Sequence, residues 1–309
     1  MSGLEWLVPS LLTIVTAATP LVFAAVGEIV VEKSGVLNLG VEGMMIIGAI
    51  AAFAVAVSSG NSTLAVLAGA VGGAAMAFIF GFLTLYLLSN QVATGLALTI
   101  FGIGLSALIG HAFIGTTFDG LPQLAIPGVS DIPVIGPLLF GQDALVYLSV
   151  ASVIAVTWFL NRTRWGLVVR AVGESHDAAH SIGYPVIRVR LAAILFGGAM
   201  AGLGGAYLSL AYTPLWAENM TAGRGWIALA LVVFASWRPW RSFFGAYLFG
   251  GITIIQLHAQ GMGVDVPSQF LSMLPYLATI VVLVLISRDE TRARLNAPAC
   301  LGRSFHAPG

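Results

Sequence analysis

The segment RTRWGLVVRAVGESHDAAHSIGYPVIRVR, residues 162–190, is the longest hydrophilic stretch of the chain, and it decides how the rest is laid out. It carries five of the thirteen lysine and arginine residues, and apolar segments flank it on both sides. Within it, Ser175 is suited to cap a short helix, and Asp177 suits the positive end of that helix's dipole. Gly183, followed by Pro185, is suited to end the helix. The sequence therefore predicts a short helix inside a polar connection.

This short helix has two interpretations. Ala178, Ala179 and Ile182 are expected to share one small, apolar face. Such a helix, tied at both ends to membrane helices, could lie in a groove on a cytosolic partner and carry that partner's motion into the membrane. The alternative is a solvated turn, and the residues alone leave both interpretations open.

The composition indicates an all-α polytopic membrane protein. Of the 309 residues, 58% are hydrophobic and 8% are charged, and the mean hydropathy is +0.97. An ordinary soluble domain has roughly 25% charged residues. Apolar segments recur that are long enough to cross a hydrocarbon core of about 30 Å. The predicted spans are residues 9–31, 40–58, 63–88, 92–113, 143–161, 191–213, 225–237, 242–259 and 270–287.

The positions of the basic residues predict the orientation, because cytoplasmic loops are enriched in lysine and arginine. If residues 162–190 are cytoplasmic, twelve of the thirteen basic residues lie inside and only Arg224 lies outside. This places the N-terminus outside and the C-terminus in the cytoplasm. We expect one transmembrane domain, residues 1–288, and a poorly ordered cytoplasmic tail, residues 289–309. The loop of residues 114–142 is then external and could cover the bundle or meet a soluble partner.

Small residues recur at every fourth position in two predicted spans. They let helix backbones approach closely and therefore predict a tightly packed bundle rather than a solute site. The positions are Gly69, Gly73, Ala77 and Gly81 in one span, and Gly197, Gly198, Ala201, Gly202 and Gly205 in the other.

Charged and polar groups at membrane depth are functional candidates by default. The segment GEIVVEKSGVLNLGVEG, residues 27–43, contains four charged side chains and several glycines that weaken a continuous helix. It predicts a helix, a break and a second helix. Asn38 and Glu42, four residues apart, are expected to share one face and to line a pathway for a polar solute. The alternative places this segment in water at the cytoplasmic surface.

A second polar cluster opens the fourth predicted span. It consists of Ser89, Asn90, Gln91 and Thr94. Asn and Ser favour helix caps, so the cluster is expected either to cap this helix or to face the same pathway.

The chemistry that the sequence lacks narrows the function. A nucleotide-binding P-loop needs Gly-Lys-Ser/Thr, and the only lysine, Lys33, follows Glu32. His176 and His180 lie four apart, but no third ligand lies nearby, so we interpret them as solvated loop histidines and expect no metal site. No catalytic motif is evident, and a net charge of zero argues against nucleic acid as a partner. We expect no cofactor and no enzymatic activity in this chain.

Four segments resemble one family in its own order, across residues 20–288. They are SGVLNLGVEGMM (residues 34–45), NQVATGLALT (90–99), AVGESHDAAHSIGYPVIRVRLAA (171–193) and GRGWIALALVVFASWRPW (223–240). They are similar to the permease subunits of ABC importers in the branched-chain amino acid and simple-sugar group. The sequences of these segments are most similar to those of the subset that serves purine-nucleoside uptake.

This resemblance implies a type II ABC importer permease, a bundle of about eight to ten helices in a bacterial plasma membrane. It implies three partners in addition to membrane lipid: a second homologous permease, a cytosolic ATPase that holds ATP and Mg²⁺, and an extracytoplasmic substrate-binding protein. Residues 162–190 would be the coupling loop that the ATPase grips. Gly173, Glu174, Ala178 and Gly183 match the family's coupling-loop pattern, and Asn38 and Glu42 match its signature near the pathway, whereas His176, Asp177 and His180 depart from it. Together with the local patterns described above, the expected coupling residues are Gly173, Glu174, Ser175, Asp177, Ala178 and Gly183, and the expected pathway residues are Asn38, Glu42, Asn90, Gln91 and Thr94.

The expected function is uptake of nucleosides or a related simple sugar by alternating access. A rival from another class is an ion- or proton-coupled secondary transporter that works without an ATPase. In that rival, Glu28 and Glu42 would relay the coupling ion.

Overall fold

A computed structural model describes residues 3–124, 135–261 and 296–306, together with residues 267, 269–270, 273–274, 277–278, 280–281 and 284. These residues form helices, joined by loops that contain two isolated β-bridges. The α-helices are α1 (Gly3–Lys33), α2 (Val41–Ser59), α3 (Ser62–Gly81), α4 (Gln91–Gly110), α5 (Ile135–Phe140), α6 (Ala144–Arg162), α7 (Arg164–Glu174), α8 (His176–Ser181), α9 (Val186–Tyr207), α10 (Arg224–Phe234) and α11 (Pro239–Gly261). The expected all-α polytopic fold is confirmed.

Within the described part of the chain, six helices are long and apolar enough to cross a membrane. They correspond to the first six predicted spans. Two of them continue as a π-helical turn, α3 into Phe82–Tyr86 and α9 into Leu208–Tyr212. The last predicted span, residues 270–287, lies largely outside the described residues.

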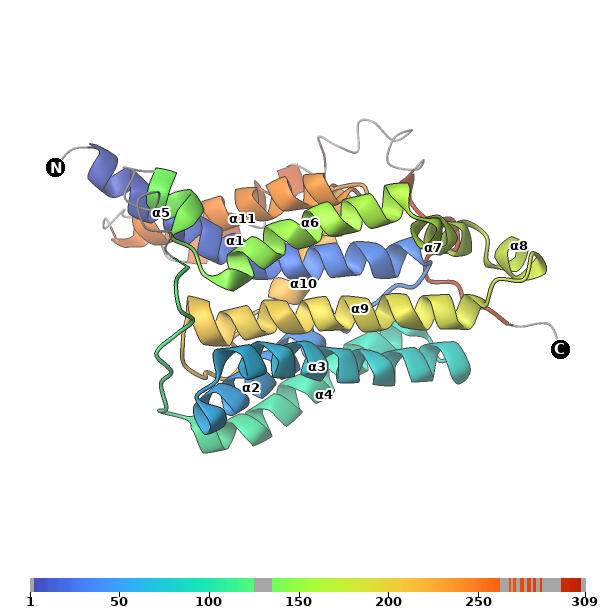
Figure 1. The fold of residues 1–309 in the computed structure, drawn as a ribbon, viewed down its shortest axis with the longest axis horizontal. Helices are drawn as coiled ribbons and strands as arrows, with labels where there is room; N and C mark the ends of the chain where they lie inside the picture. Colours follow the sequence, from blue (N-terminus) through green and yellow to red (C-terminus); the bar gives the residue numbers. More distant parts are fainter. Residues whose placement is uncertain are drawn as a thin grey trace.

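Helix α9 is the centre of the bundle and packs against α1, α2 and α3 (Figure 1). The two stripes of small residues meet here. A Cβ atom added at Gly73 would collide with the carbonyl oxygen of Gly198, and one at Gly202 would collide with that of Gly69. The predicted packing role of these stripes is confirmed, because only glycine allows the backbones to come this close.

A break of seven residues, 34–40, separates α1 from α2, as the sequence predicted. Gly35 has φ +87°, which glycine adopts readily. A Cβ there would lie 3.2 Å from the Cα of Gly173, which begins the expected coupling element. The break therefore brings the end of α1 into contact with the end of α7.

The predicted span at residues 225–237 is wrong. Helix α10 has eleven residues, and at about 1.5 Å per residue it extends only about 16 Å, about half of a hydrocarbon core. It runs beside α1 and ends at a turn in which Ser236 and Trp237 have φ values of +50° and +55°. A short helix of this kind can begin inside the bundle.

The molecule has two distinct ends along its long axis (Figure 1). Helices α7 and α8 lie at one end, together with the C-terminal segment of residues 296–306. The N-terminus and α5 lie at the other. This arrangement separates a polar end, which carries the hydrophilic segment, from the rest of the bundle.

Candidate functional site

The polar end is built from two capped helices. The hydroxyl of Thr163 accepts a hydrogen bond from the amide of Gly166 (3.0 Å) at the start of α7. The hydroxyl of Ser175 accepts one from the amide of Ala178 (3.3 Å) at the start of α8. Gly183, with φ +92°, follows the end of α8. The predicted short helix, with its cap and its glycine stop, is confirmed.

The expected apolar face of α8 is only partly present. Ala179 is buried, whereas Ala178 is exposed and Ile182 is 72% exposed. Glu174 and Asp177 are exposed as well. The three apolar residues therefore do not share one face: α8 turns Ala179 inward and presents a mixed polar and apolar surface outward.

Gly173 belongs to the interior of this end. It is buried, and a Cβ there would collide with the carbonyl oxygen of Lys33. Of the expected coupling residues, Gly173 therefore holds α7 against α1, while Glu174, Asp177, Ala178 and Gly183 are exposed and Ser175 caps α8.

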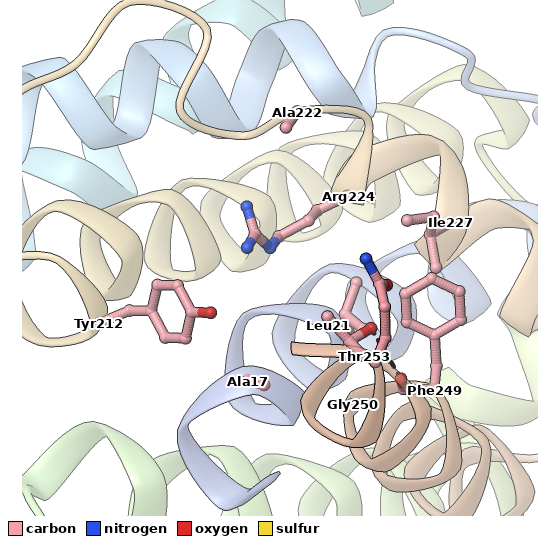
Figure 2. A pocket seen from close by; sticks show the side chains of 10 residues that line it. Ala17, Leu21, Tyr212, Ala222, Arg224, Ile227, Phe249, Gly250 and Thr253 are labelled. Carbon is pink, nitrogen blue, oxygen red and sulfur yellow. Dashed lines mark hydrogen bonds between the residues drawn. The ribbon is translucent and has the colours of Figure 1, made fainter. Parts of the chain in front are cut away.

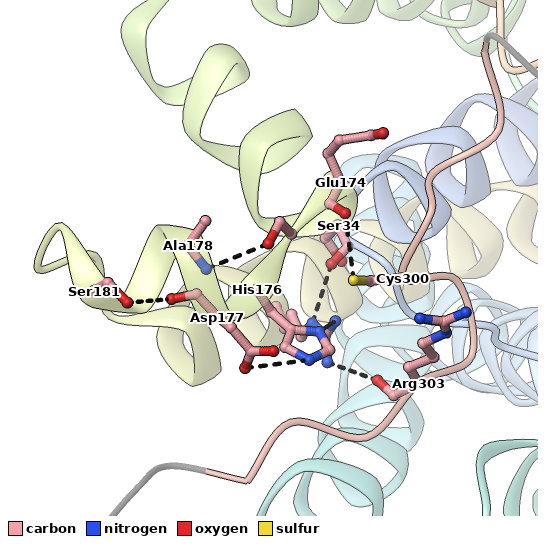
Figure 3. Close-up of polar contacts among 10 residues, drawn as sticks. Ser34, Glu174, His176, Asp177, Ala178, Ser181, Cys300 and Arg303 are labelled. Atoms are coloured by element: carbon pink, nitrogen blue, oxygen red, sulfur yellow. Dashed lines mark hydrogen bonds and ion pairs between the residues drawn. The ribbon is translucent and has the colours of Figure 1, made fainter.

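A fully buried arginine, Arg190, joins four segments at this end. Its Nε donates to the carbonyl oxygen of Ser34 (3.1 Å) and its Nη1 to that of Arg303 (3.0 Å). Its Nη2 lies 3.1 Å from Nδ1 of His176. Arginine can only donate, so Nδ1 of His176 accepts and its proton lies on Nε2, which is 3.6 Å from Oδ1 of Asp177 (Figure 3).

The interpretation of the two histidines as solvated loop residues is wrong. The rings of His176 and His180 each pack against the ring of Phe305, with centroids 5.3 Å apart in both pairs. His176 is buried, and burial followed by the charge of Arg190 lowers its pKa, while Asp177 acts in the opposite direction. Among the described residues, no group of three potential metal ligands occurs.

The C-terminal segment of residues 296–306 is packed onto the polar end, which differs from the poorly ordered tail that we expected. The amide of Cys300 donates to the carbonyl of Gly173 (2.9 Å), and that of Gly302 donates to Gly35 (3.1 Å). Nζ of Lys33 donates to the carbonyl of Asn296 (2.6 Å). Phe305, a lone aromatic side chain in a polar tail, was the one signal in the sequence that could have indicated this packing.

The carboxylate of Glu42 is held at the start of α10. Its Oε1 accepts from the hydroxyl of Thr221 (2.5 Å) and the amide of Gly223 (2.7 Å), and its Oε2 accepts from the amide of Gly225 (2.6 Å). These amides are the free donors of a helix N-terminus, where a negative charge is favourable. Glu42 therefore fixes α10 to α2 inside the bundle.

The side chains of Glu28, Glu32 and Asn38 are also buried, and each makes a hydrogen bond. Asn38 precedes α2, so it does not share a helical face with Glu42, and that expectation is wrong. Its Nδ2 donates to Oε2 of Glu28 (3.3 Å), and Oε2 of Glu32 accepts from Nε1 of Trp237 (2.5 Å). Glu28, Glu32, Asn38 and Glu42 are at most 2% exposed, so they do not lie in surface water.

The cluster at the start of α4 caps that helix, one of its two expected roles. Oδ1 of Asn90 accepts from the amide of Ala93 (3.0 Å), and the hydroxyls of Ser89 and Thr94 are 2.9 Å apart. Oε1 of Gln91 accepts from the amide of Leu37 in the break (2.8 Å). The cluster thus fixes α4 to the segment between α1 and α2.

A cavity of about 200 Å³ opens beside the start of α10 (Figure 2). Its walls come from α1, the π-helical turn after α9, α10 and α11. Ala17 and Leu21 contribute from the middle of the span Val8–Lys33, and Arg224 contributes a guanidinium group. The sequence placed Arg224 outside the membrane, whereas here it lies beside the middle of α1. The sequence did not single out this cavity, because its lining is distant in the chain.

These features define a class: a polytopic helical membrane protein with a short, buttressed helix at one end, a half-length helix inside the bundle and beside it a mainly apolar cavity that carries a few polar groups. The chain belongs to the permease family described as "Branched-chain amino acid transport system / permease component", whose model matches residues 10–286. The family resemblance seen in the sequence is confirmed.

Three relatives match over nearly their whole length. "Putative glucose ABC transporter permease protein TsgC13" of Haloferax volcanii is 40% identical over 94% of this chain and 95% of its own. The nucleoside ABC transporter permease protein NupC of Lactococcus lactis is 32% identical over 87% of this chain and 89% of its own. The guanosine ABC transporter permease protein NupQ of Bacillus subtilis is 30% identical over 93% and 94%, respectively.

Proposed function

We propose that this chain is the transmembrane permease subunit of an ATP-driven ABC importer. It moves nucleosides, or a related simple sugar, into the cell by alternating access and catalyses no reaction itself. The main observation in support of the proposal is that α8, at the polar end, is held firmly by Arg190 and Phe305. Ala178 of α8 and Ile182 just after it are exposed. Arg190 of α9 links His176 of α8 to the segment after α1, and Phe305 packs the C-terminal segment on the same histidine, so motion of α8 is transmitted to the bundle.

The proposed partners supply the functions that this chain lacks: the energy source, the other half of the pathway and the delivery of the solute. The sequence has no P-loop lysine, so ATP and Mg²⁺ belong to a cytosolic ATPase that docks on α8. A second, homologous permease completes the pathway, and an extracytoplasmic binding protein delivers the solute at the other end. We place this assembly in the bacterial plasma membrane with the C-terminus in the cytoplasm, because twelve of the thirteen basic residues then lie inside.

The named functions of the relatives support the solute class. Two relatives are named for nucleoside or guanosine transport and one for glucose, and the nucleosides and the sugar share a hydroxylated ring. The rival secondary transporter is less well supported. Its relay would need Glu42, but three hydrogen bonds from the first turn of α10 and the residues just before it already hold both oxygens of that carboxylate.

Uptake by the reconstituted complex tests the proposal. The permease pair, its ATPase and its binding protein are placed in liposomes, and labelled guanosine and labelled glucose are offered separately. We expect ATP-dependent accumulation of at least one of them and none without the ATPase. Uptake by the permease alone, driven by a proton or sodium gradient, would contradict the proposal and support the secondary transporter.

A further inference from the structure

The cavity beside α10 combines a cationic side chain with small and aromatic residues at mid-membrane depth. We propose that it binds the hydroxylated sugar ring of the transported solute, and that Arg224 and Gln256 determine this specificity. The inference rests on the proposed function and adds the site and the part of the solute that it recognises. A nucleoside and a free monosaccharide share this ring chemistry.

Arg224 is the first observation. A charged side chain at membrane depth is unfavourable and usually marks a solute pathway. Its Nη1 donates to the carbonyl oxygens of Met220 (3.0 Å) and Thr221 (3.4 Å), and the guanidinium lies 5.2 Å from the ring centre of Tyr212. Within the described residues, Nε and Nη2 have no hydrogen-bond partner and no carboxylate pairs with Arg224. Donors therefore remain for a ligand in the cavity.

Gln256 is an independent second observation. It lines the cavity from α11, is only 9% exposed, and makes no hydrogen bond to any residue that the structure describes. Its amide is not one of the enclosed polar atoms that lack a partner, so it is accessible to a ligand from the cavity. An amide offers both a donor and an acceptor, as does each hydroxyl group of a sugar ring. A diol can therefore satisfy Gln256 and Arg224 together.

The aromatic and small residues of the wall suit a ring-shaped solute. Tyr212 lies on one side of Arg224 and Phe249 on another, while Ala17 and Gly250 leave space at the base (Figure 2). Small-molecule sites combine such apolar walls with a few placed polar groups. At about 200 Å³ the cavity is smaller than the usual range of about 300–1,000 Å³, so it receives the sugar ring rather than a whole nucleoside.

The local charge favours an uncharged solute over a phosphate ester. The amides of Gly223 and Gly225, which would bind a phosphate at this helix start, already donate to Glu42. The carboxylate of Glu42 therefore already occupies the positive end of this helix's dipole. Neutral hydroxyl groups therefore fit the remaining donors better than a second anion.

Protection of an introduced cysteine tests the location. In a Cys300→Ser background, Ala222→Cys places a thiol in the cavity wall, and Ser59→Cys places a control thiol on the exposed end of α2. Both are labelled with a thiol reagent in the assembled complex, with and without guanosine, glucose, guanine or glucose phosphate. We expect the transported sugar-bearing solute to slow labelling of Ala222→Cys about tenfold and to leave Ser59→Cys unchanged. Guanine, which has no sugar ring, should give no protection.

Two substitutions test the residues. Arg224→Gln and Gln256→Met should each lower uptake of the transported solute about tenfold at a concentration below saturation, and abolish the protection. Arg241→Gln, on an exposed position of α11, is the matched control and should transport normally. Gln256→Met keeps about the same side-chain volume and removes no hydrogen bond to a described residue, so we expect it to reach the membrane at wild-type yield, which is measured beside uptake.

Three outcomes overturn the inference. They are equal protection by guanine, stronger protection by glucose phosphate, and wild-type uptake by both variants. In each case the complex still imports solute, so the proposed function survives. A wild-type complex that imports neither guanosine nor glucose with ATP instead removes the proposed function, and this inference with it.

Discussion

At the scale of single residues, Arg190 is the most constrained group of the polar end. It is fully buried, and its three nitrogen atoms hydrogen-bond to Ser34 after α1, His176 of α8 and Arg303 of the C-terminal segment. A buried charge is tolerated when its hydrogen bonds are complete. The bond to His176 is the vulnerable one, because it requires a neutral imidazole ring that can accept.

This requirement predicts a pH dependence. The pKa of His176 is lowered in the folded protein, so the unfolded chain binds the proton more tightly. The neutral His176 ring contributes its full stabilisation of the folded protein above the ordinary histidine pKa of about 6.5. This contribution is lost as the pH falls toward the lowered pKa that His176 has in the folded protein. Thermal unfolding of the purified complex should show this loss between about pH 7.5 and 5.5. It is limited to about 1.5–3 kcal/mol, the contribution of a hydrogen bond to a charged group.

Two variants separate this effect from other titrating groups. His176→Gln keeps an acceptor for Arg190 but does not titrate, so it should reduce the dependence on pH. His180→Gln is the matched control, because among the described residues His180 only packs on Phe305. An unchanged pH dependence in His176→Gln would be evidence against the role of the neutral ring.

Local signals at this scale could be predicted from the sequence, and distant partners could not. Ser175 and Asn90 cap helices as their residue types indicate, because a cap depends on only three or four neighbouring residues. The contact of Phe305 with His176 joins residues far apart in the chain. No local pattern specifies such a pair, so the two histidines were misinterpreted.

At the scale of elements, the contact between α3 and α9 depends on the absence of side chains. A Cβ at Gly202 would lie against the backbone of Gly69 and Gly73. Gly202→Val should therefore separate the two helices and destabilise the protein by about 3 kcal/mol or more. Membrane yield and thermal unfolding in detergent measure the effect.

Gly104→Val is the control for this substitution. Gly104 lies in α4, and a Cβ there has open space. Both changes replace glycine by valine inside a helix, so the intrinsic helical preference is the same. Equal stability of the two variants would show that the close approach of α3 and α9 is not required.

Helix α10 shows why hydropathy alone gave a wrong span. Residues 225–237 form one apolar run, and the average hydropathy of such a run does not indicate where the helix within it ends. The helix ends because Ser236 and Trp237 adopt positive φ, and the bond from Trp237 to Glu32 holds this turn against α1. At its other end Glu42 fixes the start of the helix, so the length of α10 is set by partners in other helices.

At the scale of the whole molecule, the braced α8 predicts that docking and folding can be separated. Ala178 is exposed, and its hydrogen bonds to described residues are backbone bonds within α8 and its caps, so Ala178→Glu should leave the thermal stability within about 0.5 kcal/mol. In the reconstituted complex the same charge should abolish uptake while the ATPase still hydrolyses ATP. Paired measurements of uptake and phosphate release check this uncoupling.

A charge at the far end of the molecule is the control. Thr63→Glu, exposed in the first turn of α3, should neither destabilise nor uncouple, because an acidic side chain is favourable near a helix start. If Ala178→Glu imports solute at the wild-type rate, α8 is not the docking surface.

The layout of the whole molecule was largely accessible from the sequence. The first six spans and the break after Lys33 follow from long apolar runs and clustered glycines, which are properties of contiguous residues. The cavity was not accessible, because Ala17, Arg224 and Gln256 come from three helices that only the packing brings together.

The C-terminal segment also has a consequence for how the protein is made. The residues that bond to Gly35, Gly173 and Arg190 follow all the described helices of the bundle along the chain, so these hydrogen bonds form only after the helices have been synthesised. Until then Phe305 is missing from the two histidine rings, and α8 is held from one side only. The surface that we assign to the ATPase is therefore completed after the helices that carry it, so a chain that stops before residue 300 does not present this surface in its final form.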